Sequence, residues 1–312
     1  MIVGGCSAFG VISGIIASAP SIEDIDATPT GYLTTVLDNQ GNQTATLVAS
    51  GSNRKYVTIN EIPINLQHAF VAIEDERFYD HNGIDLQGIL RAGLKGVASG
   101  FHFSEGASTI TQQLLKNTVF TQWTSEQSMA DKFERKFQEQ YLALQLEKVV
   151  DKDWILVKLV LNAINLGQNT LGVGVASERY FGKDVSDLTL SECAVLAAIT
   201  QSPSYYNPIT HPDHNKERRQ KVLNNMLDQG YISQTEYDEA VADNVYDRIQ
   251  VVNVESQDEN INSYFVDEMT DQIVQDMIDR LGVHGDAGLQ SSLSGGTYHR
   301  VHAGPGYPEY LR

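Results

Sequence analysis

The chain has few cysteines and few basic residues for its length. Only two of its 312 residues are cysteine, so neither a disulfide framework nor a cysteine-rich metal site can be built. Lysine and arginine number 22 against 40 aspartates and glutamates, which gives a formal net charge of −18. Binding of nucleic acid requires a basic face, so we expect no nucleic-acid partner. Any anionic substrate must be held by a few local cations against the overall field.

Long apolar runs are also scarce, and the one candidate lies at the start of the chain. Residues 1–19 carry no charge and are apolar or small. A membrane span needs about 20 apolar residues, so we interpret 1–19 as part of a transmembrane anchor. A cleaved signal peptide is the alternative, although no basic region precedes the run.

The rest of the sequence divides by its periodicity. Residues 20–60 contain an acidic linker and then an alternating stretch around Asp38-Asn39-Gln40-Gly41, which predicts a small β-hairpin. Helical periodicity dominates from residue 61 to residue 250, the segment that we interpret as the catalytic domain. The expected helices are 66–75, 85–98, 109–120, 133–149, 154–165, 189–201 and 215–229, with a further one at 262–281.

The most informative segment is 106–117, where a turn of Gly, Ser and Thr opens an amphipathic helix. Gln112, Gln113, Lys116 and Asn117 lie at helical spacing, so they can crowd one wall of a cleft. Amides and an ammonium without acids offer hydrogen-bond donors to an anionic, oxygen-rich ligand. The alternative is an ordinary polar helix face in contact with solvent.

A first candidate for acid–base chemistry is Glu74, which with Asp75 ends the apolar stretch 69–73. A carboxylate at the rim of an apolar element is a natural general base, because partial removal from water favours proton uptake. The alternative is a structural acid pair that is bonded to Arg77.

The second candidate carboxylate is Glu139. Lys132, Arg135 and Glu139 lie at i, i+3 and i+7, which places them on one face of the predicted helix. A glutamate flanked by bases can orient them on a phosphate or hold a divalent ion; the alternative is a surface ladder of ion pairs. An acid with a cationic clamp is typical of glycosyl chemistry, and a phosphate leaving group needs no protein acid to protonate it.

Five blocks, in this order, resemble the family 51 glycosyltransferase domain of class A penicillin-binding proteins and of monofunctional peptidoglycan glycosyltransferases. The blocks are EDERFYDHNG at 74–83, GASTITQQLLKN at 106–117, RKFQE at 135–139, and the longer stretches 161–183 and 190–223. The resemblance implies a mainly α, lysozyme-like glycosyltransferase fold with a small N-terminal β-hairpin region and an N-terminal membrane segment. It also implies an inverting hexosyltransferase that polymerises lipid II into β-1,4 glycan strands and releases undecaprenyl diphosphate.

The resemblance assigns roles to residues of these blocks. Glu74 is then the general base for the acceptor hydroxyl, and Glu139 supports the donor diphosphate directly or through Mg²⁺ or Mn²⁺. Lys116 neutralises the diphosphate with help from Arg135 and Lys136. Residues expected to shape the substrate sites are Asp75, Phe78, His81, Ser108, Gln112, Gln113, Asn117 and Lys132.

The implied partners are lipid II, the growing glycan strand, the membrane and the proteins of a cell-wall synthesis complex. The expected location is a bacterial cell membrane, with a single-pass anchor and the catalytic domain on the extracytoplasmic side. The segment 94–105 matches the apolar stretch that contacts lipid in the family.

Three departures from the family pattern stand out. Asp131 and Lys132 occupy the region where many relatives carry an arginine before the Arg-Lys pair. The helix around 155–162 lacks the family's tyrosine and is one residue longer, which would rotate the next turn by about 100°. No transpeptidase domain follows, so we interpret 251–312 as a linker toward a missing domain, with a tail that is translated out of frame.

Two other functions stay open at this point. A lysozyme-like, glycan-cleaving enzyme would share the fold and an essential glutamate, but cleavage of a neutral glycan needs no cationic clamp. A catalytically dead cell-wall scaffold is the other alternative, because of the irregular helix at 157–161.

Overall fold

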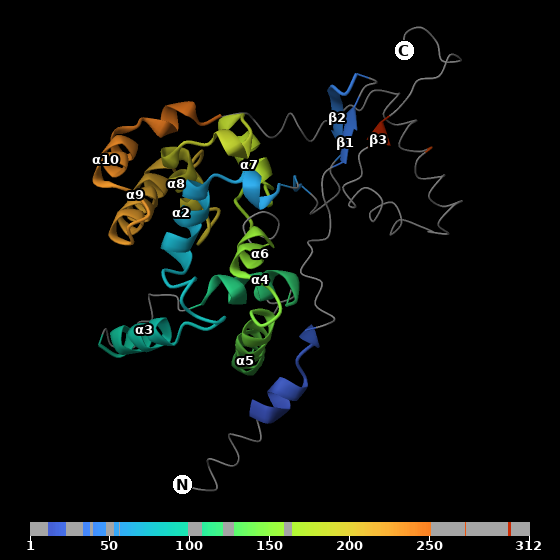
Figure 1. The fold of residues 1–312 in the computed structure, drawn as a ribbon, viewed down its shortest axis with the longest axis vertical. Helices are drawn as coiled ribbons and strands as arrows, with labels where there is room; N and C mark the ends of the chain where they lie inside the picture. The colour runs from blue at the N-terminus through green and yellow to red at the C-terminus, as the bar shows by residue number, and fades with distance from the viewer. Residues whose placement is uncertain are drawn as a thin grey trace, which may run out of the picture.

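The computed structural model describes residues 12–22, 34–37, 40–47, 53–55, 57–98, 108–120, 128–158, 164–250, 272 and 299–300. This part of the chain is mainly helical, as expected (Figure 1). A short helix lies at residues 12–17. The labelled helices are α2 (Ile64–Glu74), α3 (Leu86–Ala98), α4 (Ile110–Thr118), α5 (Met129–Leu146), α6 (Lys152–Val157), α7 (Val173–Phe181), α8 (Leu190–Ile199), α9 (Pro212–Asp228) and α10 (Gln234–Ala242). Short 3-10 helices lie at Ile59–Glu61, Val185–Asp187 and Val245–Arg248.

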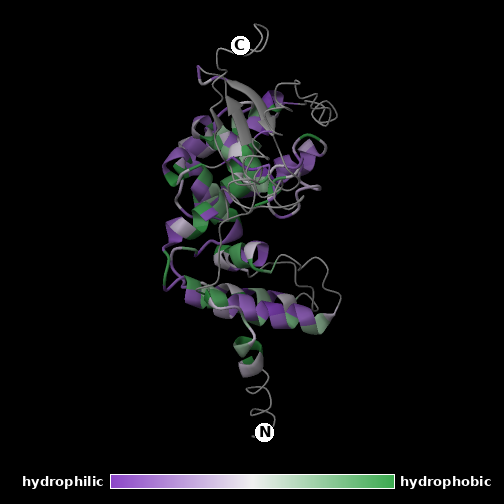
Figure 2. Ribbon diagram, turned by 90° about the vertical axis from the view of Figure 1, so that its right-hand side faces the viewer, coloured by the Kyte–Doolittle hydropathy of each residue, from purple (hydrophilic) through white to green (hydrophobic). Residues whose placement is uncertain are grey.

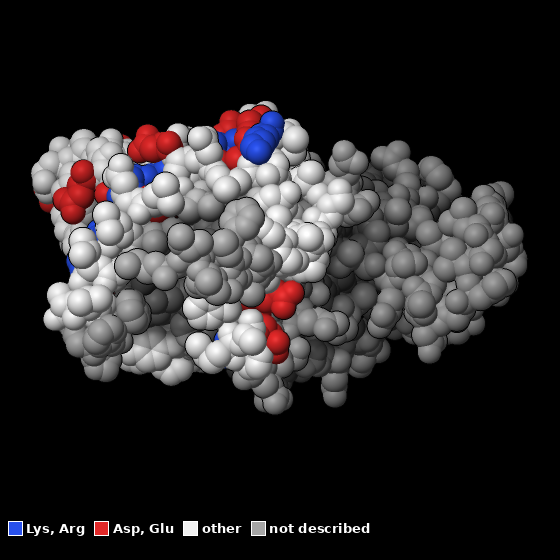
Figure 3. Space-filling view, turned by 90° about the horizontal axis from the view of Figure 1, so that it is seen from below, with Lys and Arg blue, Asp and Glu red and all other residues white. Residues whose placement is uncertain are grey.

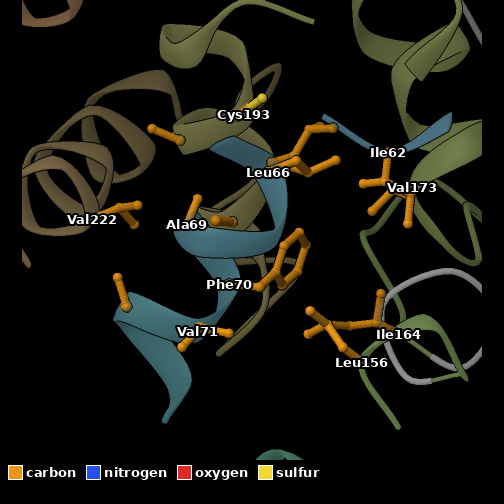
Figure 4. Packing of buried hydrophobic residues seen from close by; sticks show 14 of the residues in the cluster. Ile62, Leu66, Ala69, Phe70, Val71, Leu156, Ile164, Val173, Cys193 and Val222 are labelled. Carbon is orange, nitrogen blue, oxygen red and sulfur yellow. The ribbon is translucent and has the colours of Figure 1, made fainter. Parts of the chain in front are cut away.

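The core is built around α8, a helix with apolar or small residues on every side. All residues from Ser191 to Ile199 are buried, which is the pattern of a helix covered by its neighbours all round. Helices α2 and α9 pack against α8. Figure 4 shows α2 in the middle of this core, with Val222 of α9 on one side and Val173 and Leu156 on the other. The end of α2 is thereby held in a fixed place.

A second group of helices lies below this core in the views of Figures 1 and 2. Helix α4 packs against α5 and α6, and α3 lies to one side. Helix α2 runs from the core toward this group and ends at Glu74. Figure 2 shows hydrophilic and hydrophobic residues mixed along the lower helices. In Figure 1 the end of α2 lies between the two groups.

Two helices were not expected from periodicity. Helix α7 is short, and seven of its nine residues are buried. It is bounded by Gly172 and Gly182, both with positive φ. The polar helix α10 begins with a capping box of Ser233 and Glu236, a signal that we overlooked. The expected helix 154–165 is present as α6 up to Val157, and residues 159–163 lie outside the described part. Its expected end is wrong, because Asn165 forms a β-bridge with Leu171.

Three short strands lie apart from the helices (Figure 1). Strand β1 (Thr34–Leu37) pairs antiparallel with β2 (Gln43–Leu47), on either side of the expected turn. Strand β3 (His299–Arg300) pairs parallel with β1, in a tail where we expected little fold. The expected helix 262–281 and most of the tail lie outside the described residues. Within the described ranges, no helix combines the length and the apolar character needed to cross a bilayer, and residues 1–11 of the expected anchor are not among them.

Candidate active site

Glu74 is the last residue of α2, and its carboxylate lies where α2, α4, α8 and α9 meet. Its Oε2 accepts a hydrogen bond from Gln113 Nε2 of α4 at 2.9 Å. Its Oε1 accepts one from the Thr200 hydroxyl at the C-cap of α8, and it lies 3.6 Å from Arg218 Nη2 of α9. The side chain is 15% exposed, so the carboxylate is largely shielded from water but still accessible to a ligand. This is the rim position that the sequence predicts for a general base.

The neighbouring Asp75 faces the protein interior. Its carboxylate accepts a hydrogen bond from the Ile110 backbone N–H, at the first residue of α4, at 2.9 Å. Both of its oxygens lie 3.0 Å from His81 Nε2. His81 Nδ1 accepts from the Gly83 backbone N–H at 3.1 Å, which assigns the imidazole proton to Nε2. A carboxylate at a helix N-terminus is favourable, so Asp75 and His81 fix the start of α4 against the end of α2.

Phe78 and Gly83 complete this buried support. The Phe78 side chain is fully buried, with Lys152 Nζ 4.5 Å from its ring centroid. Gly83 has φ +90°, and a Cβ there would lie 2.5 Å from a backbone oxygen of α5. Only glycine suits such a conformation and approach. Three residues that we expected at the substrate sites, Asp75, Phe78 and His81, therefore lie behind the site in this structure.

The second carboxylate, Glu139, is buried in a cluster of cations and polar groups. Its side chain is 1% exposed, and Arg135 Nη1 donates to its Oε1. Lys136 Nζ donates to Glu139 Oε2 at 3.1 Å, and to Ser108 Oγ and Gln112 Oε1 at 2.9 Å each. All three ammonium protons thus have an acceptor. We call these five residues the α4–α5 cluster; two cations and one carboxylate leave it one net positive charge.

Helix α4 links Glu74 to this cluster. Gln112 and Gln113 are consecutive, so they point about 100° apart around the helix. Gln113 reaches Glu74, whereas Gln112 is 1% exposed and is turned toward Lys136 and the Gly83 carbonyl oxygen. The expectation that both amides line one wall is therefore wrong, because they face two different parts of the site.

The remaining predicted residues lie further along the same helices. Lys116 lies four residues after Gln112 and three after Gln113, so it points between these two side chains, and it is half-buried. Asn117 follows it and is also half-buried. Lys132 is exposed on the first turns of α5, one turn before Arg135 and Lys136.

Two residues around Glu74 were not expected, namely Thr200 and Arg218. Thr200 follows a helix of uniformly buried residues and gives no pattern of its own. Arg218 stands in the pair Arg218-Arg219 on amphipathic α9, where Arg219 is 3% exposed. Two adjacent helical residues cannot face the same side, so a buried Arg219 turns Arg218 toward another neighbour. Which of the two arginines is buried depends on packing, so no signal in the sequence alone singles out Arg218.

The residues present do not form a metal centre by themselves. Across the described ranges, no group of three or more His, Cys, Asp or Glu side chains is placed to hold a metal ion. Both oxygens of Glu139 are paired with cations. Mg²⁺ is often held by one or two carboxylates together with substrate phosphates, so the donor set fits a metal only with oxygens from a substrate.

The fold and the site together define a class of protein: a mainly helical enzyme domain in which a partly buried carboxylate lies across one helix from a cationic cluster suited to an anionic substrate. The sequence model of the transglycosylase family matches residues 40–227, which include both carboxylates and all of α4. The chain belongs to the transglycosylase family.

Several penicillin-binding proteins are similar to the chain. It is 40% identical over 260 residues to penicillin-binding protein 1F of Bacillus subtilis, which covers 83% of this chain and 34% of that protein. It is 38% identical over 278 residues to penicillin-binding protein 1A of Clostridium perfringens, with 86% and 40% covered. A crystal structure of penicillin-binding protein 1A from Haemophilus influenzae aligns with a TM-score of 0.40 and 22% identity, over 82% of this chain and 25% of that one. The chain thus spans 34% and 40% of the two curated relatives.

Proposed function

We propose that the chain is a peptidoglycan glycosyltransferase, an inverting hexosyltransferase that joins lipid II units into β-1,4-linked glycan strands and releases undecaprenyl diphosphate. The observation that carries the proposal is the position of Glu74 and of the α4–α5 cluster on two sides of α4, within the span that matches the transglycosylase family. One helix thereby connects a candidate base to a candidate diphosphate site.

In this proposal Glu74 is the general base that accepts the proton of the acceptor sugar hydroxyl. A carboxylate oxygen has two lone pairs, so the bonds from Gln113 and Thr200 leave acceptor capacity on both oxygens. A base has to lie within hydrogen-bond reach of the proton that it removes, and the partial exposure of Glu74 permits this approach.

Departure of the diphosphate is assisted by the cations of α4 and α5. Negative charge that develops on a leaving group is stabilised best by charges that are already in place. Glu139 and Gln112 hold Lys136 in such a fixed position, and Lys116 lies on the adjacent side of α4. A glycan-cleaving enzyme of the lysozyme type acts on a neutral substrate and has no use for this cluster, which disfavours that alternative.

A divalent cation, Mg²⁺ or Mn²⁺, remains a prediction. Its support is that a diphosphate would bring oxygen ligands to the one carboxylate of the cluster, Glu139. Chelation by EDTA, followed by addition of each metal, tests it: the prediction requires that synthesis falls on chelation and returns with metal.

Membrane association is part of the proposal, together with a single-pass anchor, an extracytoplasmic catalytic domain and partners from a cell-wall synthesis complex. Helix α3 supports the membrane contact. Its side chains Leu86, Leu90, Leu94 and Val97 are 74%, 64%, 64% and 60% exposed and lie on one face. Seen from below, the described surface is mostly uncharged (Figure 3). An exposed apolar helix face of this kind is typical of a helix that lies in a membrane interface.

The test of the function is synthesis of glycan from labelled lipid II, followed on gels with and without the inhibitor moenomycin. We expect polymer and released undecaprenyl diphosphate from the unmodified chain, and neither from Glu74→Gln, which is isosteric and should retain the fold. Release of short fragments from finished glycan would indicate the hydrolase. Full synthesis by the Glu74→Gln variant would contradict the role of Glu74.

A further inference from the structure

Arg218 and Arg219 are consecutive on α9 but have different surroundings. Arg219 is 3% exposed and donates from Nη2 to Ser191 Oγ at 2.7 Å and to the Ala240 carbonyl oxygen. It thus joins α8, α9 and α10. Arg218 faces the other way, toward the carboxylate of Glu74.

The guanidinium of Arg218 is held in place by groups other than Glu74. Its Nη1 donates to Gln201 Oε1 at 2.6 Å, and its central carbon lies 5.0 Å from the ring centroid of Tyr206. The side chain is only 10% exposed, and its buried Nε has no acceptor among the described residues. The position of this positive charge is therefore set before any substrate binds.

The contact between Arg218 and Glu74 is electrostatic. Nη2 and Oε1 are 3.6 Å apart, which is beyond a good hydrogen bond. Arg218 therefore favours the ionised carboxylate without occupying the lone pairs that a sugar hydroxyl needs. Arg218 also does not have to touch the substrate to exert this effect.

We propose that Arg218 is a positioning residue for Glu74, whose fixed positive charge keeps this carboxylate ionised and oriented while an anionic diphosphate occupies the other side of α4. The inference rests on the proposed function. A diphosphate brings negative charge into the site, and like charges favour protonation of a carboxylate. A protonated Glu74 cannot act as a base, so a nearby cation is needed at the moment when the donor is bound.

The other groups that face Glu74 cannot take over this role. Gln113 from α4 and Thr200 from the C-cap of α8 are neutral. Asp75, the next residue on α2, is an acid that is bonded to His81. Lys116 lies one turn further along α4 and points between the directions of Gln112 and Gln113, and in the proposed function its charge serves the donor diphosphate. Arg218 is the ion-pair partner of Glu74 within the described part of the chain.

The test compares Arg218→Gln, Arg218→Met and Arg218→Lys in the full chain, with kcat and KM for lipid II measured from acid to neutral pH. Loss of an opposite charge beside a general base moves the acid limb of the kcat profile to higher pH. On that limb the variant is therefore slower than the unmodified chain. We expect this shift in the Gln and Met variants, with KM unchanged, whereas the Lys variant keeps the acid limb of the unmodified chain.

Arg219→Lys is the matched control, because it alters the adjacent arginine that supports the fold. We expect a lower melting temperature for it and an unchanged acid limb. The proposal is overturned if the neutral variants of Arg218 keep the acid limb of the unmodified chain, or if they lose activity equally at every pH together with melting temperature. Absence of lipid II polymerisation by the unmodified chain would instead overturn the proposed function.

Discussion

Lys136 donates hydrogen bonds to three side chains of the α4–α5 cluster. Replacement by methionine removes these hydrogen bonds while keeping most of the side-chain volume. Gln112 Oε1 is then left without its donor in a side chain that is 1% exposed. A buried polar atom that loses its partner costs about 1–3 kcal/mol. Glu139 keeps Arg135, so it does not become an isolated buried charge. We therefore expect Lys136→Met to remain folded, with a free energy of unfolding lower by about 1–3 kcal/mol.

The loss of activity should be much larger than this loss of stability. Removal of one preorganised group that stabilises developing negative charge typically lowers kcat about 100- to 1,000-fold. Glycan synthesis from labelled lipid II gives the rate, and urea unfolding gives the stability. Lys148→Met is the matched control, since Lys148 is an exposed lysine just after the end of α5 with no predicted role in the site. The proposed role of Lys136 is refuted if Lys136→Met retains more than about a tenth of the rate, which is above the range expected for such a group, or if both variants lose activity equally.

Three further predictions concern the support of the site and the surface near it. Gly83→Ala places a Cβ 2.5 Å from an α5 backbone oxygen at φ +90°, so it should lower the free energy of unfolding by about 1–3 kcal/mol and lower the melting temperature. Arg77 donates a hydrogen bond to Asp85 and so holds the pKa of this carboxyl below its ordinary value. This pair therefore stabilises the fold above the unfolded-state pKa of about 4. The contribution disappears as the pH falls through the folded-state pKa. Asp85→Asn should thus cost about 1–3 kcal/mol at neutral pH and little in acid, as urea unfolding at several pH values will report. Leu94→Glu should reduce the fraction of protein that co-sediments with anionic vesicles. Val149→Glu is the control, at a residue outside α3 that is 66% exposed, and should leave this fraction unchanged. Equal binding by both variants would contradict the membrane contact.

Local patterns in the sequence were sufficient for much of the fold. Helices α2, α3, α4, α5, α8 and α9 lie where periodicity predicts them, within a few residues at each end. The contact of Arg135 with Glu139 was also predictable, because residues four apart on a helix are neighbours wherever that helix lies. The helix α7 was not, since it is short and contains Gly174, a weak helix former.

The amino-acid sequence by itself determined the family of this chain, the helices that carry the two carboxylates, and the cations that lie beside Glu139. These features depend on spacing along one helix or on blocks of adjacent residues. Only the tertiary structure decided that Thr200 and Arg218 contact Glu74, that Asp75 and His81 face inward, and that Gln112 and Gln113 reach different parts of the site. The physical reason is that these contacts depend on how α2, α4, α8 and α9 pack, and packing of distant segments leaves no regular spacing in the chain.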